Sequence, residues 1–137
     1  MTSISALYHV HKKGLFGNCE SKNENNLLKL SEIKNMLIVQ IVQYKNSNIS
    51  FENIDIGGLK LKNEPMSVIS NNDTRILWNG PKNWLLVSTK KDLLKNILEV
   101  FKETDFAVTD LSHSRAIIGM EGSEVKEVLK KGCPFNF

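Results

Sequence analysis

The sequence predicts an α+β fold with a mostly antiparallel sheet and two to three helices. Two segments, after Thr89 and after Ser123, repeat apolar residues at helical spacing. Tight turns rather than long crossovers join the other segments, which favours antiparallel pairing with the helices on one face. Short apolar runs between turn residues predict the strands, at 36–44, 66–69, 75–78, 84–88, 106–111 and 115–120.

The first third of the chain divides into a polar arm and the start of a domain. Residues 1–35 have too few apolar side chains to build a core, so they are expected to be flexible or to order on a partner. Residues 36–137 are expected to form a single α+β domain, which begins with a central strand over 36–44. A short helix over 50–56 would end at Gly57-Gly58.

The middle of the domain is a series of strands followed by a helix. Turns at 71–73 and 79–83 separate the predicted strands. Thr89 and Asp92 have capping-box spacing and open a helix that reaches about Glu103. The residues predicted on its buried face are Leu93, Leu94, Ile97, Leu98 and Phe101.

The C-terminal segment predicts a strand, a polar turn at 112–114, a second strand and a capped helix. Ser123 is at the expected N-cap position, and Gly132 is at the expected C-cap. The lysines near Gly132 suit the negative end of the helix dipole. The apolar stripe of this helix is Val125, Val128 and Leu129.

Composition excludes several classes of protein. The net charge is only +3, and the only arginines are Arg75 and Arg115, so the clustered footprint of a nucleic-acid-binding protein is missing. The chain has no apolar run of membrane-spanning length and no signal-peptide core. Cys19 and Cys133 are far apart and lack metal-ligand spacing, which favours reduced thiols and a cytoplasmic location.

No catalytic or cofactor-binding motif is found. Glycine motifs for phosphate binding are missing, so no flavin or nucleotide is expected on this chain. His9 and His11 lack further ligands for a metal. Asp110, Ser112 and His113 lie too close together to form a catalytic triad, and local hydrogen bonds of the turn are the favoured interpretation.

Three residues remain as candidates for structure or contact. Trp84, with Trp78 across a turn, could form an aromatic platform or a partner anchor, and core packing is the simpler interpretation. Arg115 could pair with Asp110 or with a carboxylate of another chain.

Two segments of the chain resemble the gamma subunit of heterotetrameric sarcosine oxidases. The family segment Trp-Leu-Gly-Pro-Asp-Glu-Trp-Leu-Leu-Val corresponds to Leu77–Val87, which reads Leu-Trp-Asn-Gly-Pro-Lys-Asn-Trp-Leu-Leu-Val. The family ending Val-Leu-x-Lys-Gly-Cys-Pro-Leu-Asp-Leu corresponds to 128–137, which reads Val-Leu-Lys-Lys-Gly-Cys-Pro-Phe-Asn-Phe. The Asp-Leu-Ser element at 110–112 and Arg115 also match. Asn136 replaces the usual Asp, and relatives continue beyond Phe137, so this is a short member or part of a longer chain.

The resemblance implies a non-catalytic subunit of a complex that demethylates sarcosine to glycine. It implies a fold similar to part of the folate-binding glycine-cleavage T-protein. FAD, FMN, NAD, tetrahydrofolate and zinc would belong to the partner subunits, with none in this chain. The partners would be the large alpha folate-binding flavoprotein subunit, which this chain would brace, and the beta and delta subunits.

Two other functions stay open from the residues alone: a free-standing folate-binding aminomethyltransferase-like protein, and a generic regulatory or ligand-binding module. The assembly interpretation predicts a partner contact near the C-terminus. Aromatic residues that follow a helix stop often mark interfaces, although they can also fold back as a C-cap contact. The residues concerned are Pro134, Phe135 and Phe137.

Overall fold

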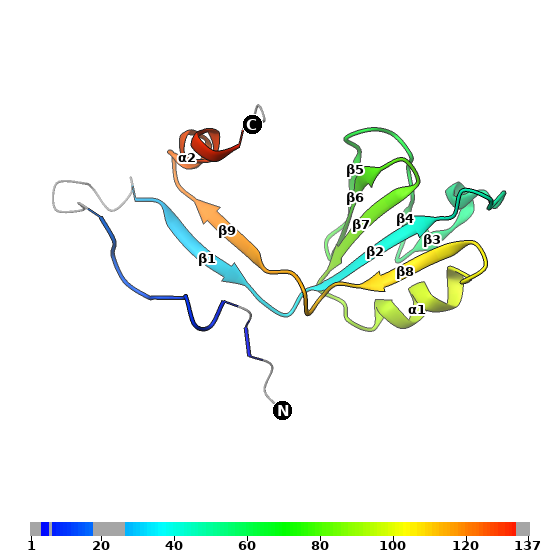
Figure 1. Ribbon diagram of the computed structural model, residues 1–137, viewed down its shortest axis with the longest axis horizontal. Helices are drawn as coiled ribbons and strands as arrows, with labels where there is room; N and C mark the ends of the chain where they lie inside the picture. The colour runs from blue at the N-terminus through cyan, green and yellow to red at the C-terminus, as the bar shows by residue number, and fades with distance from the viewer. Residues whose placement is uncertain (1–3, 6, 18–26, 134–137) are drawn as a thin grey trace. The chain divides into compact units, whose positions relative to one another are not determined.

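The computed structural model describes residues 4–5, 7–17 and 27–133. These residues form an α+β fold of antiparallel strands and two α-helices, which confirms the predicted fold class. The elements (Figure 1) are β1 (Lys29–Ile33), β2 (Leu37–Gln43), the 3₁₀ helix η2 (Phe51–Asn53), β3 (Asp55–Ile56), β4 (Leu59–Lys60), β5 (Val68–Ser70), β6 (Thr74–Gly80), β7 (Asn83–Ser88), α1 (Leu93–Val100), β8 (Phe106–Asp110), β9 (Ile117–Glu121) and α2 (Val125–Gly132).

The chain groups into two compact units. The sheet unit is Asn35–Arg115, and the strand-pair unit combines Met1–Lys34 with Ala116–Phe137. This grouping differs from the predicted arm of 1–35 and single domain of 36–137. The physical reason is strand pairing: β9 pairs with β1, which lies in the predicted arm, and not with the sheet.

The sheet unit is built on a five-stranded antiparallel sheet with the order β5-β6-β7-β2-β8. The interior strand β2, next to the edge strand β8, has Ile41 opposite Trp84 on one side and opposite Val108 on the other. Alternate residues of β2 point to one face of the sheet, and the apolar residues opposite them on β7 and β8 point to the same face. The buried cluster consists of Leu37, Val39, Ile41, Ile56, Leu59, Leu61, Ile76, Trp84, Leu86, Ile97, Phe101 and Phe106.

A tight hairpin takes up the end of the predicted helix over 50–56. Only η2 is helical, and β3 and β4 then pair across Gly57-Gly58. Both glycines have positive φ, of 58° and 83°, as a two-residue hairpin turn requires. The Asp55 carboxylate accepts a 2.8 Å hydrogen bond from the Gly58 N–H, which fixes the turn.

Helix α1 is present, and four of the five residues predicted on its buried face lie in or against the core, whereas Leu98 does not. Ile97 is 0% exposed and Leu98 is 54% exposed, so the prediction that Leu98 is buried is wrong. Successive residues on a helix are about 100° apart, and the core lies along Leu93, Ile97 and Phe101 at i, i+4 and i+8. The predicted capping box is also wrong, because Asp92 makes no side-chain cap bond.

The strand-pair unit contains a strand that the sequence did not predict. β1 pairs with β9 in antiparallel register, with Leu30 opposite Met120 and Ile33 opposite Ile117. The two predicted strands on either side of the polar turn at 112–114 therefore do not form a hairpin, because β8 pairs with β2 instead.

Helix α2 follows β9 after a sharp bend at Gly122. Gly122 has φ of 138°, and a Cβ there would lie 3.0 Å from the Leu27 carbonyl oxygen, so glycine is required. The helix has Glu124 at its N-cap without a side-chain cap bond, and the predicted cap at Ser123 is wrong. Among the described residues, no helix is long and apolar enough to cross a membrane.

Candidate partner interface

Trp84 lies in the core of the sheet unit. Its side chain is 1% exposed, its ring centroid is 4.9 Å from that of Phe51, and its Nε1–H donates a 2.7 Å hydrogen bond to the Lys62 carbonyl. Both the apolar area and the indole donor are thus satisfied within the chain. The environment of Trp84 is therefore that of a core residue, as the simpler of the two interpretations has it.

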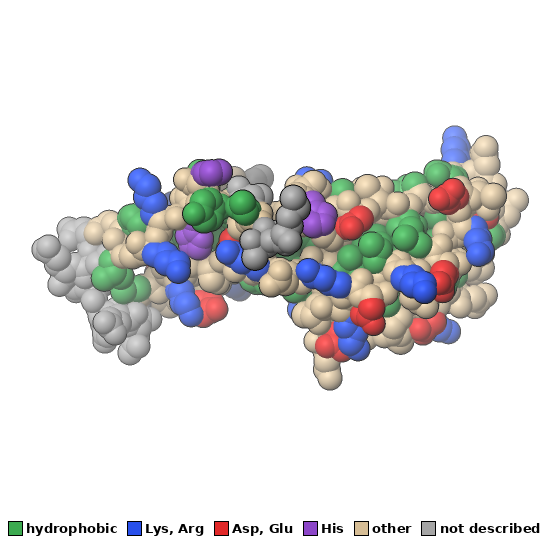
Figure 2. All heavy atoms as spheres, turned by 90° about the horizontal axis from the view of Figure 1, so that it is seen from below, with side chains coloured by type: hydrophobic (Ala, Val, Ile, Leu, Met, Phe, Trp, Pro, Cys, Tyr) green, Lys and Arg blue, Asp and Glu red, His purple; other side chains and the backbone are tan. Residues whose placement is uncertain are grey.

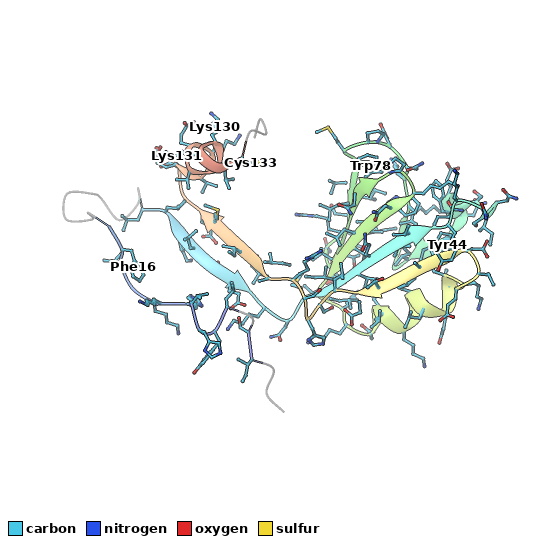
Figure 3. The ribbon with its side chains drawn as sticks, viewed as in Figure 1. Phe16, Tyr44, Trp78, Lys130, Lys131 and Cys133 are labelled. Atoms are coloured by element: carbon cyan, nitrogen blue, oxygen red, sulfur yellow. The ribbon has the colours of Figure 1, made fainter. Side chains whose placement is uncertain are left out.

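Trp78 is the half-buried partner of Trp84 across the β6–β7 ladder. It extends from β6 in Figure 3, and its Nε1–H donates a 3.3 Å hydrogen bond to the Asn63 side-chain oxygen. The same oxygen accepts a 2.9 Å bond from the Lys82 N–H. Asn63 therefore ties the loop after β4 to the turn between β6 and β7.

The turn after β8 is held by Asp110 and Ser112. The Asp110 carboxylate accepts hydrogen bonds from the Ser112 N–H at 2.9 Å and from the Ser112 hydroxyl at 2.5 Å. These bonds lower the pKa of Asp110, so its carboxylate is charged at neutral pH. The predicted local hydrogen bonding of this turn is confirmed.

Ser112 also joins this turn to β2. Its Oγ accepts a 3.0 Å bond from the Ile38 N–H, and the Leu111 N–H donates a 2.8 Å bond to the Ile38 carbonyl. Asn35 and Arg115 are the two ends of the sheet unit. The Asp-Leu-Ser element thus bonds the turn after β8 to the start of β2, close to both ends of the sheet unit.

Ser112→Ala should destabilise the sheet unit by about 1–3 kcal/mol, because it leaves the N–H of the buried Ile38 without its acceptor. Ser114→Ala is the matched control, since the Ser114 hydroxyl makes only an exposed 3.2 Å bond to the Leu111 carbonyl. We expect the control to change stability by less than about 0.5 kcal/mol. Urea denaturation of both variants measures the difference, and equal midpoints would contradict this role.

Arg115 is exposed at the end of the sheet unit and forms no ion pair with any described residue, so the Asp110 pairing considered for it does not occur. Pro134, Phe135 and Phe137 lie outside the described residues. The described part of the C-terminal segment ends at Cys133, a half-buried free cysteine next to the exposed Lys130 and Lys131 (Figure 3).

The strand-pair unit has an unusual surface. Of the described apolar side chains that are buried, none belongs to this unit. Figure 2 shows apolar side chains at its surface beside histidine and lysine side chains. The large apolar side chains exposed in this unit are Ile4, Tyr8, Val10, Leu15, Phe16, Leu30, Ile33, Ile118 and Val128.

A hollow of about 330 Å³ lies between the N-terminal segment and one face of the β1–β9 pair. Register places Glu32 opposite Ile118 and Leu30 opposite Met120 on this face. Among the described residues, no group of three or more His, Cys, Asp or Glu side chains could hold a metal ion. The residues lining the hollow are Leu7, Val10, His11, Lys12, Phe16, Leu30, Ser31, Glu32 and Ile118.

Parts of this chain are similar to known proteins. No protein-family model matches it. Sarcosine oxidase subunit gamma of Corynebacterium sp. (strain U-96) is 34% identical over 62 residues, which cover 44% of this chain and 30% of that protein. The predicted resemblance is confirmed. A chain of the heterotetrameric sarcosine oxidase from Corynebacterium sp. U-96, solved with pyrrole 2-carboxylate, has the same fold, with a TM-score of 0.68 and 22% identity.

That structural likeness covers 83% of this chain and 60% of the other chain. The present chain therefore spans less than two thirds of both proteins. The structure brings Asp110 and Ser112 together and keeps Trp84 away from them, in the core. The hollow beside Glu32 was missed, and its sequence signal in β1 was Leu30 within a polar stretch.

Proposed function

We propose that this chain is a gamma-type subunit of a heterotetrameric sarcosine oxidase, an assembly that oxidatively demethylates sarcosine to glycine. In this proposal the chain is not catalytic and braces the folate-binding part of the large alpha subunit, together with the beta and delta subunits, in the cytoplasm. FAD, FMN, NAD, tetrahydrofolate and zinc would be bound by the partners. The similarity to the Corynebacterium gamma subunit supports this assignment.

The observation that carries the proposal is the surface of the strand-pair unit. A two-stranded ribbon is marginal in water unless a third strand or a packed layer covers it. The unit exposes Leu30 to 59% and Ile118 to 57%, and its described residues include no buried apolar side chain. Apolar clusters of this kind mark protein–protein contacts. A subunit that completes its core on assembly has this property.

Co-expression with the alpha, beta and delta subunits from the same organism tests the proposal. The tagged full chain should retain the three subunits through affinity and size-exclusion chromatography, with one common peak. The control is the same expression without this chain, in which we expect the yield of the assembled alpha subunit to fall several-fold. Elution of the chain alone, with an unchanged yield of the other subunits, would overturn the proposal.

A further inference from the structure

The hollow in the strand-pair unit is apolar on most of its walls. Leu7, Val10 and Phe16 come from the N-terminal segment, and Leu30 and Ile118 come from the paired strands. Its volume of about 330 Å³ is at the lower end of the range for ligand pockets and accommodates one large side chain. The walls favour a mainly apolar occupant.

Glu32 gives the hollow one specific polar feature. Its side chain is only 9% exposed. Its Oε1 accepts a hydrogen bond from the Ser5 hydroxyl, while Oε2 is buried without a hydrogen bond to any described residue. Buried carboxylate oxygens almost always have a donor in a finished structure. Oε2 faces Lys34 Nζ at 3.4 Å as an ion pair and keeps a lone pair for a neutral donor from an occupant.

The charge of Glu32 is already balanced. Lys34 Nζ lies 3.4 Å from Oε2 as an ion pair, and Lys12 and His11 line the same hollow. A second cation from a partner would be repelled by these lysines. A neutral donor avoids that cost, and an aromatic ring beside Lys12 would gain a cation–π attraction. Tyrosine and tryptophan combine an apolar ring with one neutral donor, and both are enriched at interface hot spots.

We propose that this hollow receives a tyrosine or tryptophan side chain of the large partner subunit, whose O–H or N–H donates to Glu32 Oε2. This inference rests on the proposed function and specifies its contact. The ring fills the apolar walls, and the surrounding exposed side chains of the strand-pair unit exclude water from the contact. The ion pair with Lys34 favours the charged form of Glu32, and the positive charges of Lys34 and Lys12 select a neutral donor.

The test compares full-length variants for binding to the purified alpha subunit by biolayer interferometry. Glu32→Gln keeps the shape of the side chain but loses the charge-assisted bond, so we expect about tenfold or more weaker binding. Ile118→Ser should weaken binding to a similar extent or more. Val68→Ser is its matched control, because Val68 is 55% exposed on a strand of the sheet unit and Ile118 is 57% exposed on β9. The control should bind like the wild type.

A photo-crosslinking side chain supplies a second measurement that does not depend on the stability of these variants. Placed at Leu30, it should capture a tyrosine- or tryptophan-containing peptide of the alpha subunit, whereas at Leu98, which is similarly exposed, it should not. Capture of a second copy of this chain, or equal binding by all variants, would overturn the inference and leave the proposed function intact. If the wild-type chain does not bind the alpha subunit at all, both fail.

Discussion

Trp84→Ala should lower the free energy of unfolding of the sheet unit by about 3–5 kcal/mol, the usual cost of truncating a buried tryptophan. The side chain is 1% exposed and is enclosed by the central cluster, so its removal leaves a cavity. It also leaves the Lys62 carbonyl without the 2.7 Å bond from Nε1. Chemical denaturation followed by far-ultraviolet circular dichroism measures the change.

Trp78→Ala is the matched control, because Trp78 lies directly opposite on the next strand but is only half-buried. We expect it to cost about 1–2 kcal/mol, in proportion to the smaller apolar area removed from water. Equal losses for the two variants would mean that the two tryptophans share one environment, which would contradict the burial described for Trp84.

Ile97→Ala should cost about 2–5 kcal/mol, as expected for a fully buried aliphatic side chain. Leu98→Ala, one residue later on α1, should cost less than about 0.5 kcal/mol, because that side chain is 54% exposed. The pair removes similar numbers of carbon atoms from the same helix. Thermal melts of the two variants therefore report which face of α1 contacts the core, and a larger shift for Leu98→Ala would contradict the burial of Ile97.

The sheet unit was largely predictable from local patterns. The strands over 36–44, 84–88 and 106–111 have continuous apolar runs bounded by turn residues, and these runs correspond to β2, β7 and β8. The stripe of α1 was predicted correctly at Leu93, Leu94, Ile97 and Phe101 but was made too wide by Leu98, because leucine occurs on both sides of the true stripe. The local sequence does not say that the core contacts Ile97 rather than Leu98; the packing of the sheet decides this.

The strand-pair unit was much harder to predict. β1 contains Lys29, Ser31 and Glu32, so its apolar alternation is weak, and it pairs with a strand more than eighty residues away. A long-range pairing of this kind leaves no local signal. Two predicted strands on either side of a polar turn suggest a hairpin, because strands adjacent in sequence usually pair. Here they do not, since β8 pairs with β2 and β9 pairs with β1.

The candidate site shows the same division. The hydrogen bonds of Asp110 and Ser112 followed from the chemistry of short polar side chains in a turn. The hollow beside Glu32 did not, because its walls come from three separate segments: residues 7–16, β1 and β9. A lone glutamate in a polar stretch is normally solvated, and only the pairing of β1 with β9 places it under the N-terminal segment.

Hydrogen exchange of the full chain, measured with and without the alpha subunit, tests most directly whether the strand-pair unit is completed by a partner. In the free chain, amides of β2 and β7 should be strongly protected, and those of β1 and β9 should exchange fast, because their ribbon has no buried core among the described residues. Addition of the alpha subunit should slow exchange in 29–33 and 117–121 by at least about tenfold, and β2 and β7 should change little. Protection confined to the sheet unit, with unchanged exchange in both strands of the ribbon, would contradict the account.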